Sequence, residues 1–515
     1  MDKKKSLINV AVSICFKLIL IVLTILTKRY LIKYVGNEAN GLLSLYTSII
    51  GFLAIAELGV GTAITFSMYK PIVDNDTIKV ASLYRLFIKF YRIVGIIILI
   101  GGLIIALFLP FLAKDNQGVN LYFTFILMLI SVVIGYMYSA KTSVINAYKN
   151  NYITTSIYSI SIIFEGVLQI LLLYFFKSFE LFLLCKIISQ GLQFILTNLY
   201  FNKHHKVLKK YKEKLDDKTK EEVTKKTKAM FMHKIGGLLV NTCDSIIISS
   251  FIGVVILGKY SNYTTIVLSM NGVLLLFFTP LTSIIGHLCA KDDLSVQKKY
   301  FNFFYGLNFV LGAIFYLGYY AVIDDVIRIC FVSNVNSSTE LLMPKNVSFV
   351  IALNYFLQFM RNSTLTFRDA TGTFYNDRYK PIFEGLLNLV LSLILVQYTG
   401  IVGVILATII TNILICHVVE PFVLFKYGFA TKPTNYYIIN YSFIAIFIFS
   451  LFTINYIHYD TSNVWMSFLV NGFIAVAFTL IPCSLMFLIN KDFRQEMFVI
   501  LKSIVNKIKK NKRTD

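Results

Sequence analysis

Seven charged residues lie inside long apolar stretches of the sequence, and they offer the most chemistry. They are Lys17, Glu57, Glu165, Lys186, Lys234, Asp244 and Glu384. A charge at the centre of a bilayer costs about 2.5–3.5 kcal/mol on insertion scales, so it normally faces a water-filled cavity or an opposite charge. A lysine there can hold a phosphate, and a carboxylate can carry a proton or a sodium ion. These residues are therefore candidates for a transport pathway.

The sequence contains no arrangement of residues typical of an enzyme or a metal site. No Ser/His/Asp order and no Walker loop stands in a suitable context, and His204 and His205 lie in a polar linker. The seven cysteines are scattered singly, unlike a disulfide framework or a set of zinc ligands. We therefore expect no cofactor, no metal and a function in transport rather than catalysis. The energy must come from an ion gradient or from substrate and product concentrations.

The composition predicts an all-α integral membrane protein. Of the 515 residues, 57% are hydrophobic and only 15% are charged, and the mean hydropathy is +0.71. A soluble chain could not bury so much apolar surface. Many apolar runs are long enough to cross ~30 Å of hydrocarbon as a helix, and the short alternating segments of a strand barrel are absent from the sequence. We predict about 14 transmembrane helices. They cover residues 8–30, 40–68, 93–112, 119–140, 153–176, 180–201, 229–254, 259–289, 301–323, 347–366, 380–397, 400–425, 436–456 and 464–489.

Lysine and arginine are distributed unevenly between alternate connections. With the N-terminus in the cytoplasm, most of the 49 lysines and arginines fall in cytoplasmic segments, as the positive-inside rule requires. A missed or invented span would destroy this asymmetry, so both termini are predicted to be cytoplasmic. The net charge of +22 then indicates attraction to anionic membrane lipids rather than to nucleic acid. The basic tail is typical of an interfacial amphipathic helix, with a solvated tail as the alternative.

An internal repeat appears when the sequence is shifted against itself by 217 residues. Residues 36–49 then fall on residues 253–266 with several identities. The matching pairs include Gly36 and Gly253, Gly41 and Gly258, Ser44 and Ser261, and further upstream Lys17 and Lys234. At nearly the same offset, Phe164–Leu168 falls on Phe383–Leu387. The repeats lie an even number of spans apart, so they should form two parallel six-helix lobes, with two extra helices after them.

The predicted domains follow from the repeat and from the longest charged connection. They are an N-lobe over residues 1–201, a charged cytoplasmic linker over 202–228, a C-lobe over 229–427, two extra spans over 428–490, and a basic cytoplasmic tail over 491–515.

Three segments of the sequence resemble a known family. They read FLAIAELGVGTAITFSMYKPIVDND from Phe52 to Asp76, HKIGGLLVNTCDSIIISSFIG from His233 to Gly253, and FRDATGTFYNDRYKPIFEGLLN from Phe367 to Asn388. In these segments the chain is similar to the bacterial polysaccharide-biosynthesis, Wzx-type repeat-unit flippases, and the likeness runs to about Phe429. That family belongs to the multidrug/oligosaccharidyl-lipid/polysaccharide exporter superfamily.

The resemblance implies a location, a substrate and a mechanism. It implies a multi-pass protein of the bacterial cytoplasmic (inner) membrane. It also implies a flippase that moves undecaprenyl-pyrophosphate-linked oligosaccharide repeat units to the outer leaflet by alternating access, for capsule, O-antigen or exopolysaccharide assembly. A polymerase and other polysaccharide-assembly proteins would be its partners.

The charged residues in the spans give hypotheses about the site. We expect Lys17 and Lys234, at equivalent positions of the two lobes, to face a shared cavity and hold the anionic pyrophosphate. The alternative is that each lysine reaches the cytoplasmic interface. Glu57, before a pair of glycines, and Asp244 are further candidates for translocation; Glu57 could carry a coupling proton or sodium ion, or form a structural salt bridge.

The remaining charges are expected to be structural, coupling or gating residues. Glu165, Glu384 and Lys186 are predicted to tie helices together rather than to contact substrate. A cytoplasmic gate of ion pairs is the hypothesis for one cluster of charges, with a solvated loop as the alternative. That cluster consists of Arg361, Arg368, Asp369, Asp377, Arg378 and Lys380.

Two other classes of function stay open at this point. A cation-coupled multidrug exporter of the same superfamily would need an acidic, apolar cavity rather than a basic one. A membrane-embedded polysaccharide polymerase or ligase usually has a large external loop. The longest predicted external segment, Asp324 to Asn346, is short, which counts against the enzyme. A flippase of peptidoglycan or teichoic-acid precursors is a further alternative.

Overall fold

The computed structural model describes residues 3–57, 60–116, 118–211, 213, 215, 220–221, 242–291, 293–332 and 340–511. Throughout these ranges the regular structure is helical, and no strand occurs among them. This confirms the predicted all-α fold class. Lys234 and the first part of the segment His233–Gly253 lie outside the described residues.

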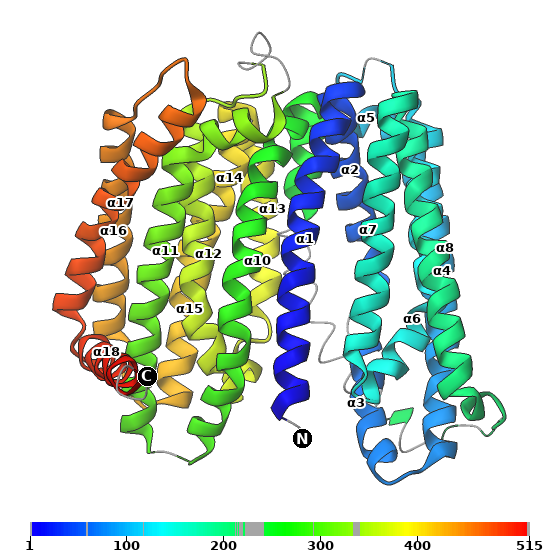
Figure 1. Ribbon diagram of the computed structural model, residues 1–515, viewed down its shortest axis with the longest axis horizontal. Coiled ribbons are helices and arrows are strands. Elements are labelled where there is room, and N and C mark those ends of the chain that lie inside the picture. Colours follow the sequence, from blue (N-terminus) through cyan, green and yellow to red (C-terminus); the bar gives the residue numbers. More distant parts are fainter. Residues whose placement is uncertain are drawn as a thin grey trace. The chain divides into compact units, whose positions relative to one another are not determined.

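Figure 1 shows the order of the helices along the chain. In the first half they are α1 (Lys3–Tyr34), α2 (Asn37–Leu53), η1 (Ala54–Glu57), α3 (Val60–Val73), α4 (Thr77–Ala106), α5 (Leu109–Leu112), α6 (Leu121–Ala147), α7 (Asn151–Phe176), α8 (Phe179–His204) and η2 (Lys206–Lys209). After an unlabelled helix, Thr242–Phe251, they are α10 (Val254–Lys291), α11 (Leu294–Phe331), α12 (Lys345–Ala370), η4 (Thr373–Asp377), α13 (Lys380–Thr399), α14 (Ile401–Thr411), η5 (Asn412–Cys416), α15 (His417–Val423), η6 (Leu424–Gly428), α16 (Thr434–Ile457), α17 (Val464–Ile489) and α18 (Lys491–Asn511).

Nine helices of the described residues are long and apolar enough to cross a membrane. They overlap the predicted spans that begin at residues 93, 119, 153, 180, 301, 380, 400, 436 and 464, although α4 begins at Thr77, well before its predicted span. The other five predicted spans correspond to α1, the pair α2 and α3, the helix Thr242–Phe251, α10, and α12. A polar sequence in α12 and a break between α2 and α3 explain why hydropathy and length alone do not select two of them.

The second predicted span is broken in the middle. α2 ends at Leu53, the 3₁₀ turn η1 follows, and α3 begins at Val60. Such breaks in a membrane helix occur where the backbone lines a cavity or contacts other protein. The break places Glu57, the last residue of η1, between two helical segments.

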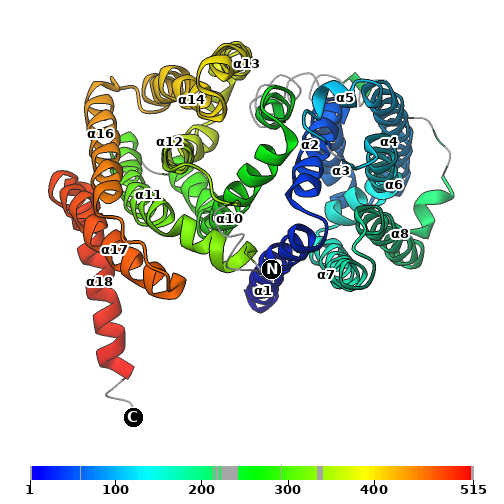
Figure 2. The ribbon, with the colours of Figure 1, turned by 90° about the horizontal axis from the view of Figure 1, so that it is seen from above.

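The chain divides into two compact units. Unit 1 comprises residues 1–262, 330–341 and 381–404, and unit 2 comprises residues 263–329, 342–380 and 405–515. In unit 1, α6 packs between α4 and α8, and α7 packs against α8 and α1 (Figure 2). In unit 2, α12 packs against α15, and α16 packs against α17. The two six-helix lobes drawn from the repeat differ in boundaries from these units, and the lobe boundaries stay a prediction.

The basic C-terminal segment forms α18, and it runs crosswise to the helices beside it. α18 is seen end-on in Figure 1, where α16 and α17 stand upright. Its first turns are held to α11: Phe493, only 3% exposed, fills the space beside Gly306, and Glu496 forms an ion pair of 2.7 Å with Lys299. The next residues, including Phe498 and Leu501, are exposed. A crosswise helix with an exposed apolar face is the geometry of an interfacial helix.

Candidate functional site

Glu57 is bound by two tyrosines from neighbouring helices of unit 1. Tyr91 of α4 donates to its Oε1 at 3.2 Å, and Tyr136 of α6 donates to its Oε2 at 3.0 Å. Gly61 makes the first contact possible, because a Cβ at this position would lie 2.5 Å from the Tyr91 hydroxyl. Among the described residues no cation forms an ion pair with Glu57. The carboxylate therefore depends on neutral donors, an arrangement that can exchange a proton or a small cation without first breaking a salt bridge.

The starts of α2 and α10 cross in close contact within unit 1. An added Cβ on Gly41 would lie 1.8 Å from the carbonyl oxygen of Val254, and one on Gly258 would lie 2.3 Å from that of Asn37. The two contacts are equivalent in the repeat, because Gly41 matches Gly258 and Asn37 matches Val254. Only glycine allows two backbones to approach so closely.

A serine pair marks the centre of this crossing. Ser44 Oγ donates to Ser261 Oγ at 2.7 Å, and these two residues are themselves repeat equivalents. Equivalent residues touch each other only beside a two-fold axis. The helices also begin alike, because Gly36 and Gly253 precede them with φ values of +111° and +135°, which favour glycine. The repeat found in the sequence is therefore present locally as a parallel, two-fold helix pair.

Polar side chains reinforce the crossing. Asn40, fully buried, donates to the Gly258 carbonyl at 2.8 Å and to Asn262 Oδ1 at 2.9 Å. Lys28 of α1 donates to the Ser261 carbonyl at 2.9 Å and to its hydroxyl at 2.7 Å. The sequence analysis did not single out Lys28, which lies near the end of the predicted span 8–30. The buried amides and the lysine hold α1, α2 and the start of α10 together.

The remaining translocation candidates are Lys17, Asp244 and Lys234. Lys17 is exposed on α1, and Asp244 is half-buried on the helix Thr242–Phe251. Lys234 lies outside the described residues, so its predicted pairing with Lys17 stays a prediction.

Glu165 and Lys186 tie α7 to α8 in unit 1. Their ion pair measures 3.3 Å, and Gln169 donates to Glu165 Oε1 at 3.2 Å. The Glu165 side chain is buried. Glu384 is half-buried on α13. A buried carboxylate with a cation and an amide beside it is a structural contact between two helices.

The cluster predicted as a gate contains a buried carboxylate that sequence reasoning missed. Glu420 of α15 is 1% exposed; Arg361 of α12 donates Nη2 to its Oε1 at 2.6 Å and Nε to its Oε2 at 3.0 Å. Lys380, also buried, donates to Oε1 at 2.6 Å. α15 lies between the π-helical turns η5 and η6, which are frequent at functional sites. The only sequence signal for Glu420 is one acidic residue before a proline inside an apolar run.

The other gate candidates form a second group at the end of α12 and on the connection after it. Arg368 donates to Asp377 at 2.6 Å and lies 3.6 Å from Asp369. Burial raises the pKa of Asp377 above its usual value, and the Arg368 guanidinium opposes that rise. Arg378 stacks on Tyr375 and Tyr379, with its guanidinium carbon 4.5 and 4.9 Å from the ring centres.

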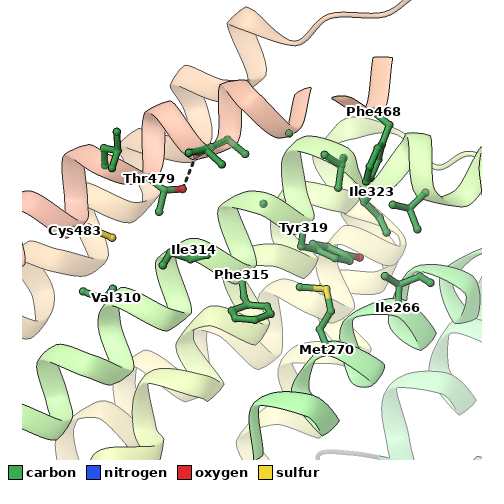
Figure 3. A pocket seen from close by; sticks show the side chains of 17 residues that line it. Ile266, Met270, Val310, Ile314, Phe315, Tyr319, Ile323, Phe468, Thr479 and Cys483 are labelled. Carbon is green, nitrogen blue, oxygen red and sulfur yellow. Dashed lines mark hydrogen bonds between the residues drawn. The ribbon is translucent and has the colours of Figure 1, made fainter. Parts of the chain in front are cut away.

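An apolar groove of about 560 Å³ lies between α10, α11 and α17 in unit 2 (Figure 3). Its few polar groups are bonded elsewhere: Thr479 donates to the Ala475 carbonyl at 2.6 Å, and Tyr319 donates to the Tyr263 carbonyl at 3.3 Å. Gly318 and Gly472 line the groove, and a Cβ on either would meet open space. The groove therefore suits a hydrocarbon ligand.

Known proteins were compared with the chain by sequence and by structure. No family model and no curated protein matches its sequence. Among solved structures, the chain is similar to a multidrug resistance MATE family transporter of the MOP superfamily in an inward-facing conformation. The TM-score is 0.64 and the sequence identity is 13%. The match covers 81% of this chain and 98% of that chain. The chain therefore shares the fold of this structure. The lipid II flippase MurJ, in an inward closed conformation, is similar with a TM-score of 0.61 at 16% identity, covering 93% of this chain and 99% of that one.

Proposed function

We propose that the protein is a flippase that moves undecaprenyl-pyrophosphate-linked oligosaccharide across the cytoplasmic membrane by alternating access. The observation that carries the proposal is the apolar groove of α10, α11 and α17. A flippase must keep a long hydrocarbon tail in an apolar environment while the sugar crosses. The groove has the volume of a ligand pocket, within about 300–1,000 Å³, and apolar walls.

The extra spans support the same function. α17 is one of the two predicted helices beyond the twelve of the repeat, and it forms one wall of the groove. The likeness to the flippase MurJ covers 93% of the chain, whereas the likeness to the MATE transporter covers 81%. A groove built partly from added helices fits a substrate that carries a lipid tail.

Alternating access requires a contact between helices that closes one side of the transport path and can separate. The α2–α10 contact meets this requirement, because it is narrow at Gly41 and Gly258 and is joined by a small number of hydrogen bonds. Each such bond contributes only about 0.5–1.5 kcal/mol. By the predicted topology this crossing is at the external side, where it would separate for release of the sugar. Lys17 and Lys28 are the cations of α1 proposed to attract the pyrophosphate.

Substitution of two glycines that line the groove should fill it without a clash with the backbone. We expect Gly318→Phe and Gly472→Phe to place a ring in the groove, because a Cβ at either position meets open space. Leu469→Phe is the matched control, since Leu469 is 58% exposed on the same helix α17 and does not line the groove. The assay follows transfer of a polyprenyl-pyrophosphate-linked oligosaccharide across proteoliposomes that contain the purified full chain.

The two glycine variants should lose at least tenfold of the transfer rate, about 1.4 kcal/mol, while the control keeps the rate of the native chain. Equal rates in all variants would reject the groove as the path of the tail. Failure of the native chain to move the lipid-linked sugar, together with extrusion of cationic drugs, would favour the cation-coupled multidrug exporter. Glu57 would then be the coupling carboxylate.

A further inference from the structure

A second cavity, of about 640 Å³, lies wholly within unit 1 and has a basic end. It is formed by α4, α6, α8 and η2, and the helices α4, α6 and α8 lie side by side in Figures 1 and 2. Four cations line it: Arg85, Arg92, Lys141 and Lys209. The rest of the wall is mainly apolar, so the cavity differs from the groove of unit 2 by its charge.

The cations gather at one end of the cavity. Arg85 is in the third turn of α4, Lys141 is near the end of α6, and Lys209 closes η2 just after α8. The N-terminal end of α4 and the C-terminal ends of α6 and α8 lie together, and the predicted topology places these ends in the cytoplasm. The cytoplasmic leaflet carries anionic lipid headgroups. A negative headgroup at this end would meet several positive charges at once.

Arg85, Lys141 and Lys209 donate to neutral acceptors. Lys141 Nζ donates to Asn198 Oδ1 and lies 5.8 Å from the centre of the Phe194 ring. Arg85 donates to the backbone carbonyl of Glu213, and its Nε is buried with no hydrogen-bond acceptor. Among the described residues, no carboxylate forms an ion pair with any of the four lining cations. A cluster of positive charges without a counterion is a site for an external anion.

The opposite end of the cavity is apolar and open to the surroundings of unit 1. Ile96 and Met137 line it and are 56% and 62% exposed. Leu99 and Val133 extend the apolar wall beyond them. A ligand that fills the cavity must therefore be anionic at one end and hydrocarbon at the other.

We propose that this cavity binds an anionic phospholipid of the cytoplasmic leaflet, with its phosphate between Arg92, Lys141 and Lys209 and an acyl chain along Ile96 and Leu99. The charge complementarity selects an anionic headgroup, and the apolar wall selects a lipid over a free phosphate. The site is separate from the groove proposed for transport, and it does not depend on the transported substrate. A lipid bound here would contact η2, because Leu208 and Lys209 line the same end.

The test is lipid binding to the purified full chain in detergent, measured by native mass spectrometry with dioleoylphosphatidylglycerol. The variant is Arg92→Gln with Lys209→Gln, since both side chains are exposed and their loss leaves the core intact. The control is Lys89→Gln with Lys206→Gln: it changes the same net charge on the same two elements, but neither residue lines the cavity. Each cation near a membrane surface contributes a factor of about five, so the variant should bind roughly 30-fold more weakly. The control should change binding by less than about twofold.

Four outcomes would overturn the proposal. Equal weakening in variant and control would mean diffuse surface attraction, and equal binding of dioleoylphosphatidylcholine would mean apolar contact without recognition of charge. Competition by free glycerol phosphate as strong as that of the lipid would assign the site to a soluble phosphate. Stronger competition by polyprenyl phosphate would assign it to the transported lipid. A photoreactive phosphatidylglycerol that crosslinks to residues 92–99 and 133–141 would support the proposal independently of the variants.

Discussion

Two carboxylates in apolar segments are held in opposite ways. Glu420 in unit 2 is 1% exposed and contacts two cations, Arg361 and Lys380. Glu57 in unit 1 is half-buried and contacts two tyrosine hydroxyls. Cations neutralise a carboxylate in an ion pair, whereas tyrosine hydroxyls donate hydrogen bonds to it without neutralising it. The comparison assigns Glu420 to the framework of unit 2 and makes Glu57 the better candidate for coupling to an ion gradient.

The largest effect should come from removing the cation-held carboxylate. Glu420→Ala leaves Arg361 and Lys380 with no carboxylate between them, and breaking a buried ion pair in this way costs about 3–5 kcal/mol. Thermal unfolding of the purified chain in detergent measures the loss. The triple variant Arg361→Met, Lys380→Met and Glu420→Leu should recover most of it, because no uncompensated charge remains. A melting temperature unchanged in Glu420→Ala would remove the basis of the comparison.

The hydroxyl-held carboxylate should behave differently. Glu57→Gln keeps an oxygen that accepts from Tyr91 or Tyr136 but cannot take up a proton, so the free energy of unfolding should change by only about 1 kcal/mol or less. Transport in proteoliposomes should lose its dependence on an imposed proton or sodium gradient. Glu165→Gln is the matched control in the same unit: it disturbs the contact with Lys186 and should leave the gradient dependence in place. Gradient dependence that persists in Glu57→Gln would show that coupling lies elsewhere.

The sequence predicts the membrane fold well because hydropathy is a local property. The nine long apolar helices overlap predicted spans, and the repeat pairs Gly41 with Gly258 before any contact is known. It does not predict which charges meet. Glu420 lies 59 positions from Arg361 and 40 from Lys380, so only the packing of α12, α13 and α15 brings the three together.

Gly61 and Lys28 are visible in the sequence, but the sequence alone does not reveal what they contact. Gly61 follows Glu57 by four positions in the sequence, and its importance is the space that it leaves for the Tyr91 hydroxyl. The position of Lys28 near the end of the predicted span 8–30 does not reveal its contact with Ser261, because that contact depends on the crossing of α2 and α10. Side-chain partners across helices are decided by packing, which periodicity and composition do not specify.

A smaller loss of stability should show whether Gly61 acts by leaving space for the Tyr91 hydroxyl. Tyr91→Phe removes one donor to Glu57 and should cost about 1 kcal/mol in the free energy of unfolding. Gly61→Ala should cost a similar amount, because its Cβ displaces the same hydroxyl. The double variant should then cost little more than either single change, since both remove one contact. Additive losses would mean that Gly61 acts through something other than Tyr91.

The smallest effect should come from a cation-held carboxylate that is not buried. Asp460 accepts from Arg328 at 2.8 Å in the connection before α17, but its side chain is 58% exposed. The hydrogen bond from Arg328 lowers the pKa of Asp460. The stabilisation is therefore present above the usual carboxyl pKa and is lost as the pH falls through the lowered value. Because solvent screens the pair, Asp460→Asn should cost only about 0.2–1 kcal/mol at neutral pH and nothing in strong acid. A loss as large as that of Glu420→Ala would show that the number of cations, and not burial, decides how strongly a carboxylate holds this fold.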